Sequence, residues 1–337
     1  MDLFNRHKDF DFVAIGDITT DAYIRLRDAK VNCDLNGKKC ELSLRFGDKV
    51  PYEFVKEIRA VGNAANAAVC ATRLGLDSAL VTNIGDDHNG AECIATLHKN
   101  KVASDFVSLQ KGKETNYHFV LWFEEERTIL VKHQEYDYKL PDIGIPKWVY
   151  LSSLGENSLD YHKQIEDYLR KNHEVKFAFQ PGTFQMKLGI ENLRDLYARS
   201  DIFFCNKEEA KRILKKPEEQ DIKNLLKEMH GIGPNVVVIT DGPNGAYAYD
   251  GYEGFFMPPF PDPKPPYERT GAGDAFSSTF ASAIASGRSL FDAFLWAPIN
   301  SMSVVQYVGA QEGLLNQEDI LKYLSQAPQD YKPQKIM

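Results

Sequence analysis

Short apolar segments that alternate with longer amphipathic ones constrain the fold of this chain more than any other feature. Segments typical of buried strands lie at 12–16, 78–85, 148–154, 175–180, 201–206, 235–240 and 245–250. Helical periodicity appears between them at 63–74, 91–99, 159–171, 207–215 and 222–229, and later at 274–286, 290–307 and from Asn316 onward. Such alternation is typical of a parallel sheet covered by helices on both faces. We therefore predict an α/β fold with a doubly wound, mostly parallel sheet, in a single domain over residues 1–337.

Two segments depart from this alternation. Residues 22–59 and 113–134 contain stretches such as YIRLRD and TNYHFVLWF, in which apolar and polar residues alternate without a clear helix between them. A period of two predicts strands with one polar face. We predict that both excursions join in one small β-sheet that covers one end of the main body. Two surface hairpins without a role are the alternative.

Charge and cysteine content exclude several classes of protein. The 40 Lys and Arg residues against 48 Asp and Glu give a net charge of −8, which argues against a general binder of nucleic acid or membranes. The chain has neither an apolar window long enough to span a bilayer nor a signal peptide, so we expect a cytoplasmic protein. Five cysteines without a C-x-x-C pair predict free thiols. A bond between Cys33 and Cys40 across a hairpin is the alternative.

The segment RTGAGDAF, at 269–276, combines a glycine turn with a carboxylate. Gly271, Ala272 and Gly273 precede a helix rich in small residues, and the unpaired N–H groups of a helix start form an anion site. Asp274, on the same turn, is placed to accept the proton of an attacking hydroxyl. The alternative is an aspartate that only favours the start of the helix.

Other polar residues follow predicted strands, at the edge where open α/β sheets bind ligands. They are Asp21 after the first strand, Asn206 and Glu209 after 201–206, and Thr240, Gly242 and Gly245 after 235–240. A second glycine turn, at Gly62, enters an alanine-rich helix that carries Asn63 and Asn66. Their amides can donate to and accept from sugar-like hydroxyls. These segments predict a site for a nucleotide and a polyhydroxylated acceptor.

The order of these motifs, from residue 16 to about 313, resembles that of the ribokinase-like, or PfkB, carbohydrate and nucleoside kinases. The segment GAGD matches the family's D-T-x-G-A-G-D, and Gly62, Asn66 and Ala68 are followed by Gly75 and Gly85 as in its glycine–asparagine motif. The resemblance implies an ATP-dependent carbohydrate kinase that uses Mg²⁺ and phosphorylates a primary hydroxyl of a sugar. A nucleoside kinase of the same family, or a non-catalytic nucleotide- or sugar-binding protein, stays open.

The resemblance also implies residue roles. Asp274 matches the catalytic base, and Gly271, Ala272 and Gly273 match the anion hole for the γ-phosphoryl group. Asn206 and Glu209 match the N-x-x-E motif that organises magnesium, with Glu209 acting through water, while Thr240, Gly242 and Gly245 match the nucleotide-contacting turn. Asp21, Gly62, Asn63 and Asn66 match substrate-binding positions. The two β excursions match the family's lid, which closes over the sugar and often forms a dimer contact.

Three residues depart from the family pattern or have two possible roles. Glu268 and Arg269 stand where the family usually has Asp-Thr, and this puts its monovalent-cation site in doubt. Arg269 either supplies positive charge near the phosphates or is a solvated side chain. For Arg127 we expect a surface ion pair, with contact to a substrate phosphate as the alternative.

Overall fold

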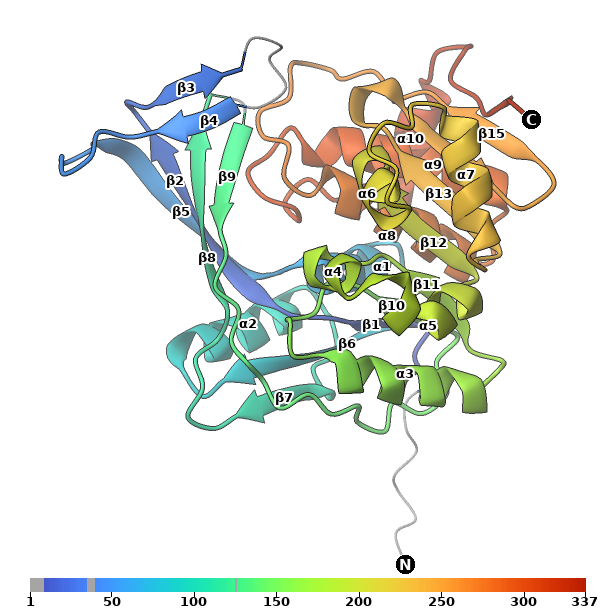
Figure 1. Ribbon diagram of the computed structural model, residues 1–337, viewed down its shortest axis with the longest axis horizontal. Helices are drawn as coiled ribbons and strands as arrows, with labels where there is room; N and C mark the ends of the chain where they lie inside the picture. Colours follow the sequence, from blue (N-terminus) through green and yellow to red (C-terminus); the bar gives the residue numbers. More distant parts are fainter. Residues whose placement is uncertain (1–8, 35–39, 125) are drawn as a thin grey trace, which may run out of the picture.

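The computed structural model describes residues 9–34, 40–124 and 126–337. Within these ranges a ten-stranded sheet runs through the main body in the order β16, β15, β14, β13, β12, β11, β10, β1, β6, β7 (Figure 1). The strands are β1 (Phe12–Ile15), β6 (Ser78–Gly85), β7 (Val107–Gln110), β10 (Trp148–Leu151), β11 (Lys176–Phe179), β12 (Ile202–Asn206), β13 (Val236–Thr240), β14 (Ala246–Tyr249), β15 (Gly254–Met257) and β16 (Gln334–Lys335). The strands from β13 to β7 pair in parallel, and β14 to β16 form an antiparallel edge. The predicted mostly parallel α/β sheet is confirmed.

Helices cover both faces of this sheet because successive strand residues point to opposite sides. Phe12 and Ala14 pack into the apolar cluster on one face, whereas Val13 and Ile15 pack into the cluster on the other. The first face is covered by α1 (Asn63–Arg73), α2 (His88–Lys99), α8 (Ala272–Ala285), α9 (Leu290–Val304) and α10 (Gln317–Ser325). The second is covered by α3 (Leu159–Lys171), α4 (Thr183–Asn192), α5 (Arg194–Arg199), α6 (Lys207–Ile213) and α7 (Ile222–Gly231). None of the described helices is both long and apolar enough to cross a bilayer.

The strand order reverses between β1 and β10, and this reversal positions the site. From β1 the chain builds outward to β6 and β7, then returns to the other side of β1 and builds outward again from β10 to β13. The loops after β1 and β10 therefore leave in opposite directions and open a crevice at the carboxyl ends of the strands. Asp17, Ser153, Gln180 and Asn206 lie at this edge, at or just beyond the ends of four parallel strands.

The predicted small sheet is confirmed and stands beside the main body (Figure 1). It has the order β5 (Tyr52–Val61), β2 (Thr19–Leu26), β8 (Tyr117–Phe123), β9 (Glu126–Leu130), so that both excursions contribute strands. Because β2 and β8 pair in parallel, the excursions are not two separate hairpins. On the face toward the main body, Tyr23, Val120 and Trp122 are buried with Val308 of the body. Trp122 is thus part of the core between the small sheet and the main body.

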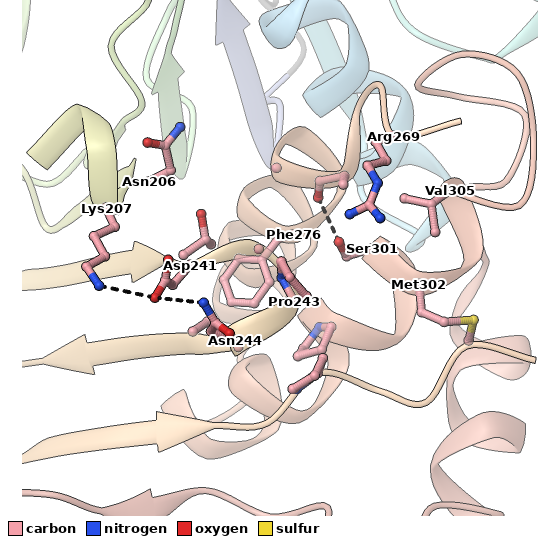
Figure 2. A pocket seen from close by; sticks show the side chains of 18 of the residues that line it. Asn206, Lys207, Asp241, Pro243, Asn244, Arg269, Phe276, Ser301, Met302 and Val305 are labelled. Atoms are coloured by element: carbon pink, nitrogen blue, oxygen red, sulfur yellow. Dashed lines mark hydrogen bonds and ion pairs between the residues drawn. The ribbon is translucent and has the colours of Figure 1, made fainter. Parts of the chain in front are cut away.

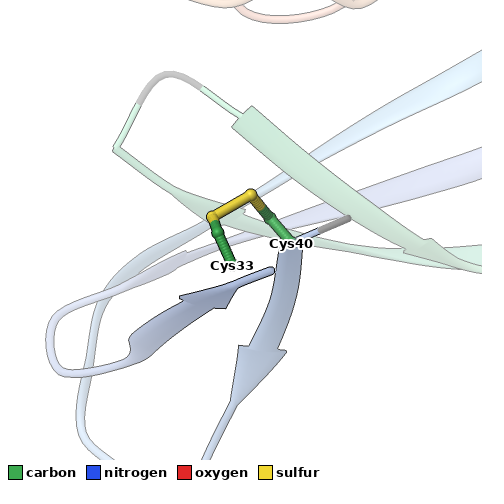
Figure 3. Close-up of a disulfide and its surroundings, with 2 residues drawn as sticks. All are labelled: Cys33 and Cys40. Carbon is green, nitrogen blue, oxygen red and sulfur yellow. A yellow bond between two sulfur atoms is a disulfide. The ribbon is translucent and has the colours of Figure 1, made fainter. Parts of the chain in front are cut away.

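A disulfide contradicts part of the cysteine prediction. Cys33 and Cys40 are bonded across the hairpin of β3 (Lys30–Cys33) and β4 (Cys40–Ser43) (Figure 3). The expectation of free thiols is wrong for these two residues because they oppose each other directly in an antiparallel pair, with Cα atoms 4.0 Å apart. Cys70, Cys93 and Cys205 are free and buried, as expected.

Candidate active site

Three amide side chains hold the carboxylate of Asp274. Asp274 lies in the first turn of α8, half-buried. Asn63 Nδ2 donates to its Oδ1 at 2.9 Å and Asn66 Nδ2 to its Oδ2 at 2.8 Å. Gln180 Nε2, just beyond β11, also donates to Oδ1 at 3.2 Å. Both oxygens are thereby kept in one orientation, at the edge where the parallel strands end.

Each of these amides is itself oriented by a second hydrogen bond to its oxygen. Gln311 Nε2 donates to Asn66 Oδ1 at 2.9 Å, and Ser153 Oγ donates to Asn63 Oδ1 at 3.1 Å. The Tyr150 hydroxyl donates to Gln180 Oε1. An amide whose oxygen is engaged in this way presents its N–H groups on the other side. All three amides therefore present donors, rather than acceptors, to Asp274.

Burial and hydrogen bonding shift the pKa of Asp274 in opposite directions. Burial raises the pKa of the Asp274 carboxyl above its ordinary value, because it disfavours the charged form. The donors of Asn66, Gln180 and Asn63 stabilise the carboxylate and oppose this shift. The net direction is upward, toward the range in which a carboxylate is a more effective proton acceptor.

Asn66→Ala is expected to move the pH profile of turnover. Loss of this donor raises the pKa of Asp274 further, so the acid limb of the kcat profile shifts to higher pH. At neutral pH we expect turnover to fall roughly tenfold to a hundredfold, because the carboxylate also loses its orientation. Steady-state kinetics across pH measure both effects. Asn192→Ala, which removes an exposed amide on α4, is the matched control. An unmoved acid limb would contradict the role given to Asn66.

A cavity of about 710 Å³ lies next to Asp274, a size typical of small-molecule sites. The predicted nucleotide and anion-hole residues that line it are Asn206, Thr240, Gly242, Gly245, Ala272 and Gly273. One wall is apolar, with Pro243, Phe276 and Met302, and Lys207 stands opposite, 3.5 Å from Asp241 (Figure 2). The proline-rich segment at 257–266 supplies another wall. Gly271, Glu209 and Asp274 are not among the lining residues.

Asn206 and Glu209 form a reciprocal cap at the start of α6. Asn206 Oδ1 accepts from Glu209 N at 2.8 Å, and Glu209 Oε2 accepts from Asn206 N at 2.8 Å. The spacing of three thus has a local structural role as a capping box. Burial raises the pKa of Glu209, and the charge of Asp274 adds to this shift. The charge of Asp274 therefore reaches Glu209 at the start of α6.

Asp21, a predicted acceptor residue, lies in β2 of the small sheet, beside two histidines. Asp21 Oδ1 is 3.4 Å from His118 Nδ1, and Asp17 Oδ2 is 3.4 Å from His133 Nδ1. The two imidazole rings are 5.2 Å apart. Asp21 Oδ1 and His118 Nε2 are buried, with no hydrogen-bond partner among the described residues. Buried polar atoms of this kind are normally satisfied, so a hydroxyl-bearing ligand is a suitable partner for them.

Gly62 and several residues that sequence reasoning missed complete this region. A Cβ at Gly62 would lie 2.6 Å from the carbonyl oxygen of Asp17, so glycine permits the close approach of α1 to the loop after β1. Gln180, Ser153 and Asp17 were not predicted. Gln180 and Asp17 follow strands of the parallel sheet, and the rule that selected Asp21 would have found them.

Among the described residues no group of three His, Cys, Asp or Glu is arranged to hold a metal ion.

Known proteins are similar to this chain over most of its length. The model of the pfkB family carbohydrate kinases matches residues 29–317. The chain is 26% identical over 282 residues to an ATP-dependent 6-phosphofructokinase of Thermoanaerobacterium thermosaccharolyticum, covering 80% of this chain and 85% of the relative. It is 26% identical over 283 residues to the ribokinase of Bacillus subtilis, covering 78% and 87%. A cytidine kinase of Thermococcus kodakarensis is 29% identical over 235 residues, covering 68% and 81%.

Solved structures share the fold. A ribokinase of Arabidopsis thaliana, complexed with ribose and ATP, superposes with a TM-score of 0.78 at 20% identity, covering 94% of this chain and 99% of that one. A candidate ribokinase II of E. coli, in complex with ATP and Mg²⁺, superposes with a TM-score of 0.72 at 17% identity, covering 94% and 99%.

Proposed function

Because this chain belongs to the PfkB family of carbohydrate kinases and has a ribokinase-like fold, we propose that it transfers the γ-phosphoryl group of ATP to a primary hydroxyl of a sugar. The observation that carries the proposal is the position of Asp274. This carboxylate is held by three amides at the carboxyl ends of the parallel strands, and it directly follows Ala272 and Gly273, which line a cavity of nucleotide size. A base between donor and acceptor is what phosphoryl transfer to an alcohol requires.

In this proposal each part of the site has one task. Asp274, oriented by Asn63, Asn66 and Gln180, takes the proton of the acceptor hydroxyl. The N–H groups of the Gly271–Gly273 turn hold the transferring group as charge develops. Thr240, Gly242 and Gly245 contact the nucleotide. Asp21 and His118 bind hydroxyls of the acceptor. Gly62, Asn63 and Asn66 form the rest of the acceptor site.

Glu209 would hold Mg²⁺ through water, together with the ATP phosphates. A single carboxylate fits this ion, since Mg²⁺ in kinases usually keeps several waters and takes its other ligands from phosphates. When bound, the ion neutralises phosphate charge. Glu209 Oε2 is engaged in the cap of α6, so Oε1 is the oxygen that can face such a water. A monovalent cation is not included in the proposal.

An acceptor panel tests the proposal. Purified protein is incubated with ATP and ribose, fructose, ketodeoxygluconate, adenosine or cytidine, and ADP release is measured with and without Mg²⁺. We expect turnover with at least one sugar, dependent on Mg²⁺. Turnover with a nucleoside alone would favour the second candidate, a nucleoside kinase. The similarity to a cytidine kinase supports this candidate. No acceptor-dependent ADP release would contradict both and favour a non-catalytic binding protein.

The small sheet is proposed to be a lid that pairs with a second copy of the chain. Phe119, Leu130 and Val55 point to its outer face and are about half exposed, at 46%, 51% and 47%. A contiguous apolar face of this kind is typical of an interface. We expect Phe119→Asp to raise the dissociation constant of a homodimer roughly tenfold or more, by loss of a buried ring.

Analytical ultracentrifugation measures this effect. Leu109→Asp is the matched control, because Leu109 is 56% exposed on β7, away from the small sheet. A wild-type protein that stays monomeric at all concentrations would contradict the homodimer. We also propose a cytoplasmic location: the three free thiols of Cys70, Cys93 and Cys205 favour a reducing compartment, whereas the Cys33–Cys40 disulfide favours an oxidising one.

A further inference from the structure

The loop that leads into the anion-hole turn contacts the small sheet through three consecutive residues. The Tyr267 ring packs edge-on against Trp122 of β8, with centroids 5.1 Å apart. Glu268 Oε1 lies 3.6 Å from Arg127 Nε of β9, and Arg269 Nε lies 3.9 Å from Glu126 Oε1. The small sheet is thus coupled to the segment that positions the start of α8.

The guanidinium of Arg127 has donors to spare at this contact. Glu268 is fully buried, and its Oε1 already accepts from the backbone N and the hydroxyl of Thr270. Its Oε2 accepts from Gly309 N at 3.3 Å. The carboxylate is therefore satisfied without the arginine, which neutralises its charge but is not needed for its hydrogen bonds. Arg127 Nε is buried without a hydrogen-bond partner among the described residues.

Arg127 also faces the place where phosphate would bind. It lines the 710 Å³ cavity together with Ala272 and Gly273 of the anion-hole turn. Its positive charge is among the influences that oppose the upward shift in the pKa of Asp274, of which burial is the largest cause. Lys207, on the opposite wall, is already paired with Asp241 at 3.5 Å. An arginine matches phosphate oxygens with several donors at fixed geometry.

We propose that Arg127 is a phosphate-binding residue that the small sheet delivers to the γ-phosphoryl group, and that Glu268 positions it. The proposal rests on the proposed function. The expected surface ion pair of Arg127 is present, because its Nη1 lies 3.8 Å from Oε2 of the exposed Glu126, and the fully buried Glu268 is a second partner. In this arrangement the small sheet adds positive charge to the anion hole.

Nucleotide titration tests this assignment without knowledge of the acceptor. Wild-type protein, Arg127→Gln and Arg25→Gln are titrated calorimetrically with Mg-ADP and with Mg-AMP-PNP, which carries a γ-phosphoryl group. We expect Arg127→Gln to lose about tenfold or more in affinity for AMP-PNP, while its affinity for ADP stays the same. Arg25→Gln is the matched control, because Arg25 lies on the same face of the small sheet as Arg127. Its guanidinium stacks over the Trp122 ring and donates to the carbonyl oxygen of Glu124. Equal loss of both affinities in Arg127→Gln would overturn the proposal.

A double variant separates phosphate binding from neutralisation of Glu268. With the acceptor found in the panel, Arg127→Gln should lower kcat roughly 10²–10³-fold, and adding Glu268→Gln should not restore it. Recovery in the double variant would mean that Arg127 only neutralises Glu268. A wild-type protein that binds neither nucleotide would overturn the proposed function as well. If the wild type binds both nucleotides and phosphorylates the acceptor, and Arg127→Gln does so equally well, this inference alone is overturned.

Discussion

Asp274→Ala is expected to lower kcat by about 10²–10⁴-fold, a loss of roughly 3–5 kcal/mol of transition-state stabilisation. The variant removes the only carboxylate that the structure places against Asn63, Asn66 and Gln180 within the described residues. Nucleotide affinity should largely survive, because Asp274 does not line the cavity. Steady-state kinetics and calorimetric titration with Mg-ADP measure the two quantities. Near-normal turnover of the variant would mean that another group accepts the proton.

Asp274→Ala is also expected to change how the free energy of unfolding depends on pH. Burial raises the pKa of Asp274 in the folded protein, so the folded state prefers the protonated form. The stability of the wild type relative to Asp274→Ala should therefore be greatest below the unfolded pKa of about 4. It should fall as the pH rises through the folded pKa. Urea denaturation of both proteins across this range measures the difference, and a difference that rises with pH would show that the carboxylate is stabilised by folding.

Gly273→Ala is expected to abolish most activity while keeping the fold. A Cβ at Gly273 meets no atom within 4 Å, and alanine favours a helix by about 1 kcal/mol, so the melting temperature should not fall. The methyl group would, however, occupy the space beside the N–H groups proposed to hold the transferring phosphoryl group. We expect kcat to drop on the order of 10²-fold, as for loss of one oxyanion donor. Unchanged turnover would show that no phosphate approaches this residue.

Gly271→Ala serves as the contrasting variant two residues away. Gly271 has φ +81°, and a Cβ there would lie 2.3 Å from Cβ and 2.5 Å from Cα of Ala310. Backbone strain and overlap together should lower the free energy of unfolding by about 2–4 kcal/mol. Thermal melts distinguish the two positions: Gly271→Ala should melt early, whereas Gly273→Ala should melt like the wild type. Equal melting would mean that the turn adapts without strain.

The fold could be predicted where the pattern is local. Buried strands such as β6 and β13 are short apolar segments. Their β-branched residues favour an extended conformation, which can be predicted from a few neighbouring residues. The helices α4 and α5 were missed, since α4 has a non-helical Gly189 within it and α5 has only six residues. β7 was missed because it is an edge strand with two exposed residues, so it has little apolar pattern.

Periodicity and glycine placement along the sequence by themselves determined the α/β sheet, the second small sheet and the position of Asp274 beside a glycine turn. These features depend on residues a few positions apart, whose conformations are limited by local sterics and by the need to bury apolar faces. Only the tertiary structure decided which side chains reach Asp274 and the cavity. Gln180, Gln311 and Arg127 come from distant segments, and Cys33 bonds Cys40 because hairpin register opposes them. Such contacts depend on strand order and on the placement of the small sheet, which result from packing over the whole chain rather than from any one segment.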